Sequence, residues 1–190
     1  MNRIAIFASG SGTNAENIIK YFKDSKEIEV VLVLSNNKDA YVLERAEKLN
    51  VQTETFDKLR FKETDEIIQL LKAKNIDFIV LAGFLWLIPA NLILAYKNRI
   101  INIHPALLPK YGGKGMYGMH VHNSVIENGE KKSGISIHLV NEKYDDGAII
   151  FQANCEIEMK DTPVSLAEKI HKLEYEHFPA VIEKWVLDKL

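Results

Sequence analysis

Short apolar runs that alternate with segments of helical spacing are the feature that most constrains the fold of this chain. The apolar runs lie at residues 4–8, 29–35, 51–55, 78–82 and 99–104. Between and after them, apolar residues recur at helical intervals around residues 18–22, 39–49, 62–75 and 89–96. Strands separated by helices of this length pair in parallel through right-handed crossovers. We therefore predict an α/β fold with a doubly wound, mostly parallel sheet.

The second half of the chain departs from this alternation. Residues 110–118 contain four glycines and predict a mobile loop, and a helix is expected at residues 120–128. Residues 133–140 and 147–157 predict an antiparallel strand pair. From Pro163 to Leu190 the spacing predicts a long amphipathic helix that is interrupted near Pro179, because proline lacks the N–H group that a helix needs.

Length, charge and cysteine content narrow the class of protein. A chain of 190 residues with 47% hydrophobic content is expected to form a single domain over residues 1–190. The net charge of -2 gives no electrostatic signature of nucleic-acid or membrane binding. One cysteine, Cys155, allows no intramolecular disulfide and no thiolate metal site. Without a signal peptide or a long apolar run, the protein is expected to be cytoplasmic.

The glycine turn Gly10–Asn14 (GSGTN) lies between the first strand and the first helix. Free backbone N–H groups and the positive end of the helix dipole favour an anion there, and the hydroxyls of Ser11 and Thr13 add donors. The turn is neither a complete dinucleotide fingerprint nor a phosphate-binding Walker loop. Two interpretations remain at this stage, a phosphate site and a tight turn that only caps the helix.

Asn102 and His104 lie two residues apart at the end of a predicted strand, and Pro105 follows them. In extended structure both side chains point to the same side, at the strand end where α/β proteins place their sites. Imidazole titrates near neutral pH, and a carboxylate from Asp145 or Asp146 would raise its pKa. An amide N–H can stabilise an oxyanion. The sequence therefore predicts an acid–base centre at this strand end.

Other histidines are less informative. His138 alternates with isoleucines in residues 135–139, so it is either a support for the predicted centre or a hydrogen-bonded residue of the sheet. His120 and His122 do not share a helical face, and no metal site is expected.

Five motifs together resemble the formyltransferase family that uses 10-formyltetrahydrofolate. They are GSGTN at residues 10–14, LAGF at 81–84, NIHPALLPKY at 102–111, GGKGMYGMHVH at 112–122 and YDDG at 144–147. The resemblance covers essentially the whole chain. It implies a Rossmann-like formyltransferase fold and transfer of the formyl group to the amine of glycinamide ribonucleotide in purine synthesis. It also implies direct attack through a tetrahedral intermediate, two small-molecule substrates, no metal, and a monomer or weak homodimer.

The same resemblance implies roles for individual residues. Asn102 would bind the formyl oxygen, a cationic His104 would stabilise the oxyanion, and Asp145 would keep that imidazole protonated. The ribonucleotide would be bound by Gly12, Thr13, Asn14 and Glu174, with Lys110 and Gly113 in a loop beside its phosphate.

For the folate, the resemblance implies contacts with Leu85, Trp86, Leu87 and Ile88, with Asn102, and with the backbone from Asn141 to Asp145. Trp86 stands where many relatives carry arginine, so an aromatic contact would replace an ion pair there. Arg60 is a candidate for a second folate-contacting arginine.

Two other functions remain open on the sequence alone. A dehydrogenase or nucleotide-binding module would use Ser9 to Asn14 as a dinucleotide turn, but it would need an acidic residue after the second strand, where this chain has Ser35, Asn36 and Asn37. The other is a non-catalytic relative that serves protein interaction.

Overall fold

The computed structural model describes residues 1–188 and contains one seven-stranded sheet in the order β3-β2-β1-β4-β5-β6-β7. The strands are β1 (Asn2–Phe7), β2 (Ile28–Ser35), β3 (Gln52–Thr55), β4 (Phe78–Leu81), β5 (Ile100–His104), β6 (Lys132–Leu139) and β7 (Ile149–Glu156). The first five pair in parallel, whereas β6 is antiparallel to both β5 and β7. The prediction of a single α/β domain with a mostly parallel sheet and an antiparallel C-terminal strand pair is confirmed.

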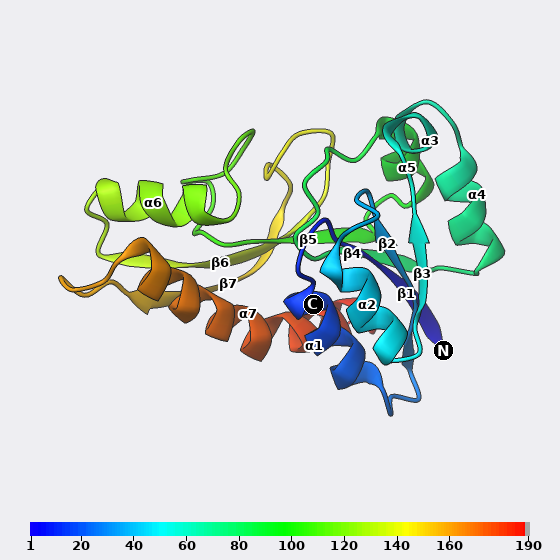
Figure 1. The fold of residues 1–190 in the computed structure, drawn as a ribbon, viewed down its shortest axis with the longest axis horizontal. Coiled ribbons are helices and arrows are strands. Elements are labelled where there is room, and N and C mark those ends of the chain that lie inside the picture. The colour runs from blue at the N-terminus through cyan, green and yellow to red at the C-terminus, as the bar shows by residue number, and fades with distance from the viewer. Residues whose placement is uncertain (189–190) are drawn as a thin grey trace.

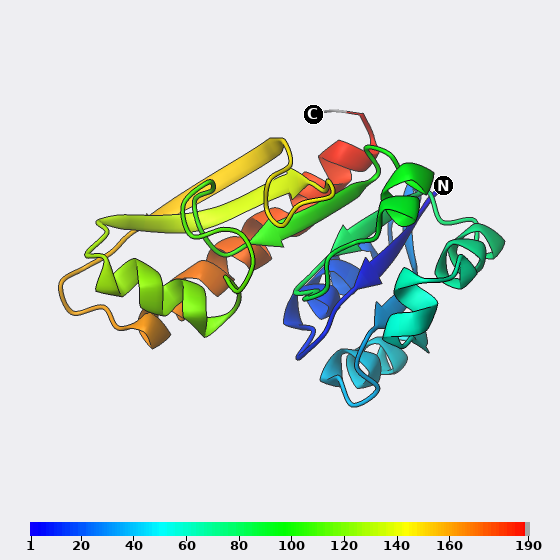
Figure 2. The same ribbon diagram turned by 90° about the horizontal axis from the view of Figure 1, so that it is seen from above.

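Helices cover both faces of the sheet, as a doubly wound fold requires (Figures 1 and 2). The helices are α1 (Thr13–Phe22), α2 (Tyr41–Lys48), α3 (Lys58–Lys62), α4 (Glu66–Ala73), α5 (Ala90–Ala95), α6 (Met119–Glu127) and α7 (Pro163–Val186). α1, α2 and α7 pack on one face, and α3, α4 and α5 pack on the other. α6 lies against α7, beside the antiparallel end of the sheet.

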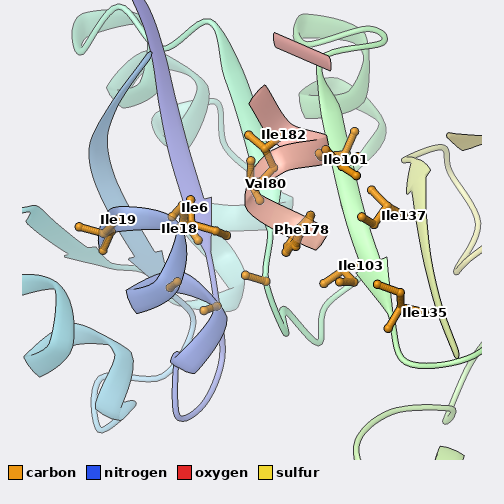
Figure 3. Close-up of a cluster of buried hydrophobic side chains, with 14 of the residues drawn as sticks. Ile6, Ile18, Ile19, Val80, Ile101, Ile103, Ile135, Ile137, Phe178 and Ile182 are labelled. Carbon is orange, nitrogen blue, oxygen red and sulfur yellow. The ribbon is translucent and has the colours of Figure 1, made fainter. Parts of the chain in front are cut away.

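Strand alternation explains the two cores. In β1, Ile4 and Ile6 point to the face of α1 and α7, whereas Ala5 and Phe7 point to the face of α3 and α4. Figure 3 shows the first core, in which strand residues meet α1 and α7. The side chains labelled there include Ile6, Ile18, Val80, Ile101, Ile103, Phe178 and Ile182.

The predicted interruption of the last helix at Pro179 is wrong. α7 runs unbroken from Pro163 to Val186, with Pro179 buried inside it. Proline removes the hydrogen bond that the carbonyl four residues earlier would accept. That carbonyl belongs to Tyr175, and it accepts a 2.9 Å hydrogen bond from Asn17 Nδ2 of α1 instead. A contact between helices thus replaces the lost bond, which sequence spacing could not reveal. The predicted helix end at Leu190 lies outside the described residues.

The predicted helix over residues 62–75 corresponds to α4, which runs from Glu66 to Ala73, whereas the short helix α3 that precedes it was not predicted. Asp57 caps α3 by accepting a 2.8 Å hydrogen bond from the Arg60 N–H group. The sequence prediction missed α3 because its start depends on this capping residue, which apolar spacing does not indicate.

Candidate active site

A cavity of about 630 Å³ opens at the carboxyl ends of the parallel strands. This is the edge at which open α/β sheets place their ligands. Five parts of the chain line it: the glycine turn after β1, the segment after β4, the end of β5 with the glycine loop, the loop between β6 and β7, and α6 with α7. Both the predicted phosphate turn and the predicted acid–base centre therefore face one space.

Residues of α2 contact the glycine turn and fix its conformation. Gly12 has a φ of +74°, and a Cβ atom at this position would lie 2.3 Å from Val42. The Val42 N–H group donates to the Gly10 carbonyl at 3.1 Å, and Arg45 Nε donates to the Ser11 carbonyl at 2.8 Å. These contacts fix the turn in a left-handed conformation that suits glycine.

The N-terminus of α1 faces the cavity. Thr13 and Asn14 are its first residues, and both line the cavity. Within residues 1–188, no protein acceptor takes the backbone N–H groups of these two residues. Unpaired amides and the positive end of a helix dipole form a site for an anion.

Glu174 of α7 meets this turn. Its carboxylate accepts a 2.9 Å hydrogen bond from Asn14 Nδ2, and its residue is only 6% exposed. Burial raises the pKa of the Glu174 carboxyl, and the bond from Asn14 offsets part of that rise. Asn14 Oδ1 is buried without a partner among the described residues. The four residues predicted to bind a ribonucleotide are thus brought together on the cavity wall.

Asn102, His104 and Asp145 also come together. Asp145 Oδ1 lies 3.3 Å from Asn102 Nδ2, and Asp145 Oδ2 lies 3.4 Å from His104 Nδ1. The backbone N–H of Gly113 donates to Asp145 Oδ2 at 2.9 Å, so the glycine loop contacts the same carboxylate. Burial raises the pKa of Asp145, but His138, His104 and the Gly113 N–H lower it more, and the net result is a lowered pKa. Asp145 is therefore ionised at neutral pH.

His138 supports Asn102 because the two residues are paired across β5 and β6. His138 Nε2 lies 3.1 Å from Asn102 Nδ2, while His138 Nδ1 lies 2.8 Å from the Leu139 carbonyl. A carbonyl only accepts, so His138 Nδ1 carries a proton and neutral Nε2 accepts from Asn102. This arrangement orients the Asn102 amide.

The expectation that His104 has a raised pKa is wrong. The His104 residue is 3% exposed, and this burial lowers the pKa of its imidazole. The attraction of Asp145 and the hydrogen bond from Nε2 to the Tyr111 carbonyl at 2.7 Å act in the opposite direction but offset only part of the effect. The sequence indicated the carboxylate, but it did not indicate how completely the ring is removed from water.

Ser136 and Gln152 fix the segment that follows His104 by hydrogen bonds. Neither residue was predicted from the sequence to have this role. The Ser136 hydroxyl donates to the Ala106 carbonyl at 2.7 Å and accepts from the Leu108 N–H at 2.9 Å. Gln152 Nε2 donates to the Ser136 hydroxyl at 2.7 Å and to the Leu108 carbonyl at 3.1 Å. A signal existed, since Ser136 alternates with isoleucines on the strand that pairs with His104.

The residues proposed for folate binding are divided between the cavity and the core. Leu85 lines the cavity. Trp86 packs against Phe56, and Ile88 is buried in the core on the α3 and α4 face. Leu87 is partly buried, and Asn141 donates to Asp146 at 3.0 Å. Trp86, Leu87, Ile88 and Asn141 are outside the cavity lining.

Two further cavity residues were not assigned a role from the sequence. His122 of α6 and His171 of α7 both line the cavity. The helical spacing of His122 with Val125, which is buried in the core, was the available signal that His122 points inward.

Arg60 is separate from the main cavity. It contacts Glu54 at 3.3 Å and Glu66 at 2.9 Å, and it lines a second cavity of about 350 Å³.

Within residues 1–188, no group of three or more histidine, cysteine, aspartate or glutamate side chains is arranged to bind a metal ion. No helix in this part of the chain combines the length and apolar character needed to span a bilayer.

Comparison with known proteins gives consistent results. Residues 2–182 match the family model described as formyl transferase. The chain is 40% identical to a chloroplastic phosphoribosylglycinamide formyltransferase of Arabidopsis thaliana, over 96% of this chain and 67% of that protein. It is 35% identical to phosphoribosylglycinamide formyltransferase of Bacillus subtilis, over 97% of this chain and 94% of that protein.

A solved structure agrees in both fold and sequence. The crystal structure of phosphoribosylglycinamide formyltransferase from Bacillus halodurans superposes with a TM-score of 0.86 at 39% identity, covering 96% of this chain and 94% of that one. The chain belongs to the formyl transferase family.

Proposed function

We propose that this protein transfers the formyl group of 10-formyltetrahydrofolate to the amine of glycinamide ribonucleotide, in de novo purine synthesis. The observation that carries the proposal is the placement of Asn102, His104 and Asp145 in one cavity with the free amides that begin α1. The names of the Arabidopsis and Bacillus relatives support the same substrate.

The ribonucleotide binds with its phosphate at the glycine turn. The amides of Gly12, Thr13 and Asn14 supply donors for the phosphate oxygens, and the helix dipole adds to the attraction. Glu174 and the unpaired Asn14 Oδ1 face the next part of the same molecule, where hydroxyl and amide donors are available. The loop that contains Lys110 and Gly113 is proposed to lie beside the phosphate of the ribonucleotide.

The transfer itself requires an oxyanion stabiliser and a proton carrier. The amine nitrogen attacks the formyl carbon, and the carbonyl oxygen becomes an oxyanion. The bond from carbon to N10 of the folate then breaks, and one proton passes in net from the amine to N10. Asn102 and His104 line the cavity where the oxyanion forms, and Asn102 Nδ2 donates to it by exchanging its 3.3 Å bond to Asp145 Oδ1 for one to substrate. His104 is the titratable group placed to carry the proton.

The negative charge of Asp145 favours protonation of His104 during formyl transfer. The resting ring has a lowered pKa, because it is buried. As negative charge develops on the substrate oxygen, that charge and the ionised Asp145 together favour the imidazolium. Before the ring can reach the substrate, Nε2 must exchange its bond with the Tyr111 carbonyl for one to substrate, which involves the start of the glycine loop.

The folate is proposed to enter beside Leu85, with backbone contacts along Trp86, Leu87 and Ile88 and along Asn141 to Asp145. The cavity volume and the apolar Leu85 side chain are compatible with a planar ring. We propose in addition that the enzyme is cytoplasmic and is a monomer or weak homodimer, which sedimentation at several concentrations would test.

A direct assay tests the function. Purified protein with both substrates is expected to form formylated glycinamide ribonucleotide and tetrahydrofolate in equal amounts, and His104→Ala is expected to abolish turnover. Wild-type protein that forms neither product would rule the proposal out. Binding of NAD(P) without folate binding would instead support a dinucleotide enzyme.

A further inference from the structure

His122 is a buried histidine that the transfer mechanism does not use. Its residue is 3% exposed, yet it lines the main cavity. Its Nδ1 atom is buried and has no hydrogen-bond partner among the described residues. A buried polar atom without a partner costs free energy, so this ring requires an explanation.

The missing partner indicates which nitrogen carries the proton. A neutral imidazole has one N–H donor and one lone pair. Orphaned buried N–H groups are rarer than acceptors left without a donor. The lone pair therefore belongs on Nδ1, and the proton belongs on Nε2. Burial, and then the charges of His171 and His104, lower the pKa of this ring to about 4. His122 is thus a neutral donor at physiological pH.

The position of His122 indicates what it faces. α6 packs against α7, and both His171 and His104 are near enough to influence His122 electrostatically. His104 marks the transfer centre, whereas His171 and Glu174 lie on α7 beside the ribonucleotide site. His122 therefore shares one cavity with the transfer centre and with the proposed ribonucleotide site. Between its phosphate and its amine, the ribonucleotide offers uncharged oxygens, namely the ribose hydroxyls and the glycinamide carbonyl.

We propose that His122 is a substrate-binding residue that donates a hydrogen bond from Nε2 to one of these uncharged oxygens of the ribonucleotide. The proposal rests on the proposed function, because that function supplies the ligand. Neither the ring nor the bonded oxygen changes charge during formyl transfer. The bond therefore stabilises the bound ground state and the transition state equally, which affects KM and leaves kcat unchanged.

Three variants test this role. His122→Phe keeps a flat ring of similar size without a donor, His122→Gln restores an N–H donor on a side chain of similar reach, and His120→Phe is the matched control on the exposed side of the same helix. For His122→Phe, we expect KM and the dissociation constant for glycinamide ribonucleotide to rise about 3- to 10-fold, the loss of one neutral hydrogen bond. The expected kcat and folate KM stay within about twofold of wild type. His122→Gln should recover part of the affinity.

Substrate analogues separate the two kinds of oxygen. Analogues that lack the 2′-hydroxyl, the 3′-hydroxyl or the glycinamide carbonyl oxygen are compared on wild type and His122→Phe. The analogue that lacks the bonded oxygen should bind equally to both proteins, because the bond is already lost. If every analogue still distinguishes the two proteins, the proposed bond does not exist.

Nitrogen NMR of the histidine rings in the wild-type protein adds a test that needs no variant. We expect His122 to be protonated on Nε2 and its Nε2 resonance to shift when glycinamide ribonucleotide binds. A proton on Nδ1, a fall in kcat at unchanged KM, or equal affinities of wild type and a folded His122→Phe protein would overturn the inference. Failure of wild type to bind glycinamide ribonucleotide at all would instead refute the proposed function.

Discussion

Asp145 is an acceptor shared by several donors, and this sharing explains its position at the centre of the site. It accepts from Asn102 and from the Gly113 N–H, and it lies beside the rings of His104 and His138. Each donor comes from a different part of the chain. The carboxylate therefore aligns the reacting groups and also provides the negative charge that a protonated His104 needs.

Replacing Asp145 with asparagine is expected to lower kcat about 100-fold and to change the dissociation constant of the ribonucleotide little, since the lost charge acts on the transition state. Steady-state kinetics combined with calorimetric binding measures both quantities. Asp146→Asn is the matched control. The Asp146 carboxylate is next to Asp145 in the sequence, but it is exposed and contacts Asn141 and Lys143. Losses of equal size in binding and turnover would contradict the proposed role of Asp145.

Buried His122 predicts a pH-dependent stability. Its pKa is about 4 in the folded protein against an ordinary value of 6.5, so the unfolded chain binds more protons between these values. Its contribution to stability is complete above about pH 6.5 and is lost as the pH falls toward 4. We expect about 2 kcal/mol of unfolding free energy to be lost from this residue between pH 8 and pH 5.

Urea unfolding at a series of pH values measures this term as the difference between wild type and His122→Phe. The difference should be absent for His120→Phe, whose ring is exposed. Parallel stability curves for wild type and His122→Phe would show that the pKa of the His122 ring is the same in the folded and unfolded states, which would contradict this prediction.

At the scale of elements, α2 controls the conformation of a turn that belongs to another part of the chain. Arg45 bonds the Ser11 carbonyl and also pairs with Glu16 of α1, so one guanidinium connects the turn, α1 and α2. Its side chain is 26% exposed, and it is not among the residues that line the cavity. Arg45 is therefore a positioning residue that acts through the backbone of the turn.

Arg45→Met is expected to raise KM for glycinamide ribonucleotide about 10-fold while kcat stays near wild type, because the turn loses its orientation toward the phosphate. A substrate analogue without the 5′-phosphate should react equally with both proteins. Lys48→Met provides the control, since Lys48 lies on the same helix in an exposed pair with Glu44. If the variant lost affinity equally for substrates with and without phosphate, Arg45 would have a general structural role.

Strand positions followed from the sequence because alternation and apolar runs are local properties. The pairing of Asn102 with His138 follows from the register of β5 and β6, which spacing alone does not specify. The predicted break at Pro179 was wrong because Asn17, far away in the sequence, replaces the missing hydrogen bond. The lowered pKa of His104 likewise depends on burial by the whole fold. Local patterns thus predicted elements and residue types, whereas contacts between distant segments determined their properties.

At the scale of the whole molecule, the cavity joins the two halves of the chain. The glycine turn and Leu85 come from the first half, and His104, Asp145 and Glu174 come from the second. The two groups of residues form one site only when the continuous sheet is complete. Ligand binding is therefore coupled to folding of the entire domain rather than to one element.

This coupling predicts a thermal shift. Glycinamide ribonucleotide at about 100 times its dissociation constant should add about 2.7 kcal/mol to the unfolding free energy. For a domain of this size, that corresponds to a rise in Tm of about 5–10 °C. Hydrogen exchange should slow in α1 and in α6 and α7 together, because the ligand contacts all three. Ribose 5-phosphate is the control, since it reaches only the turn and the sugar region and should give a smaller shift. Slowed exchange confined to α1 would mean that the ligand binds the turn without connecting the two halves.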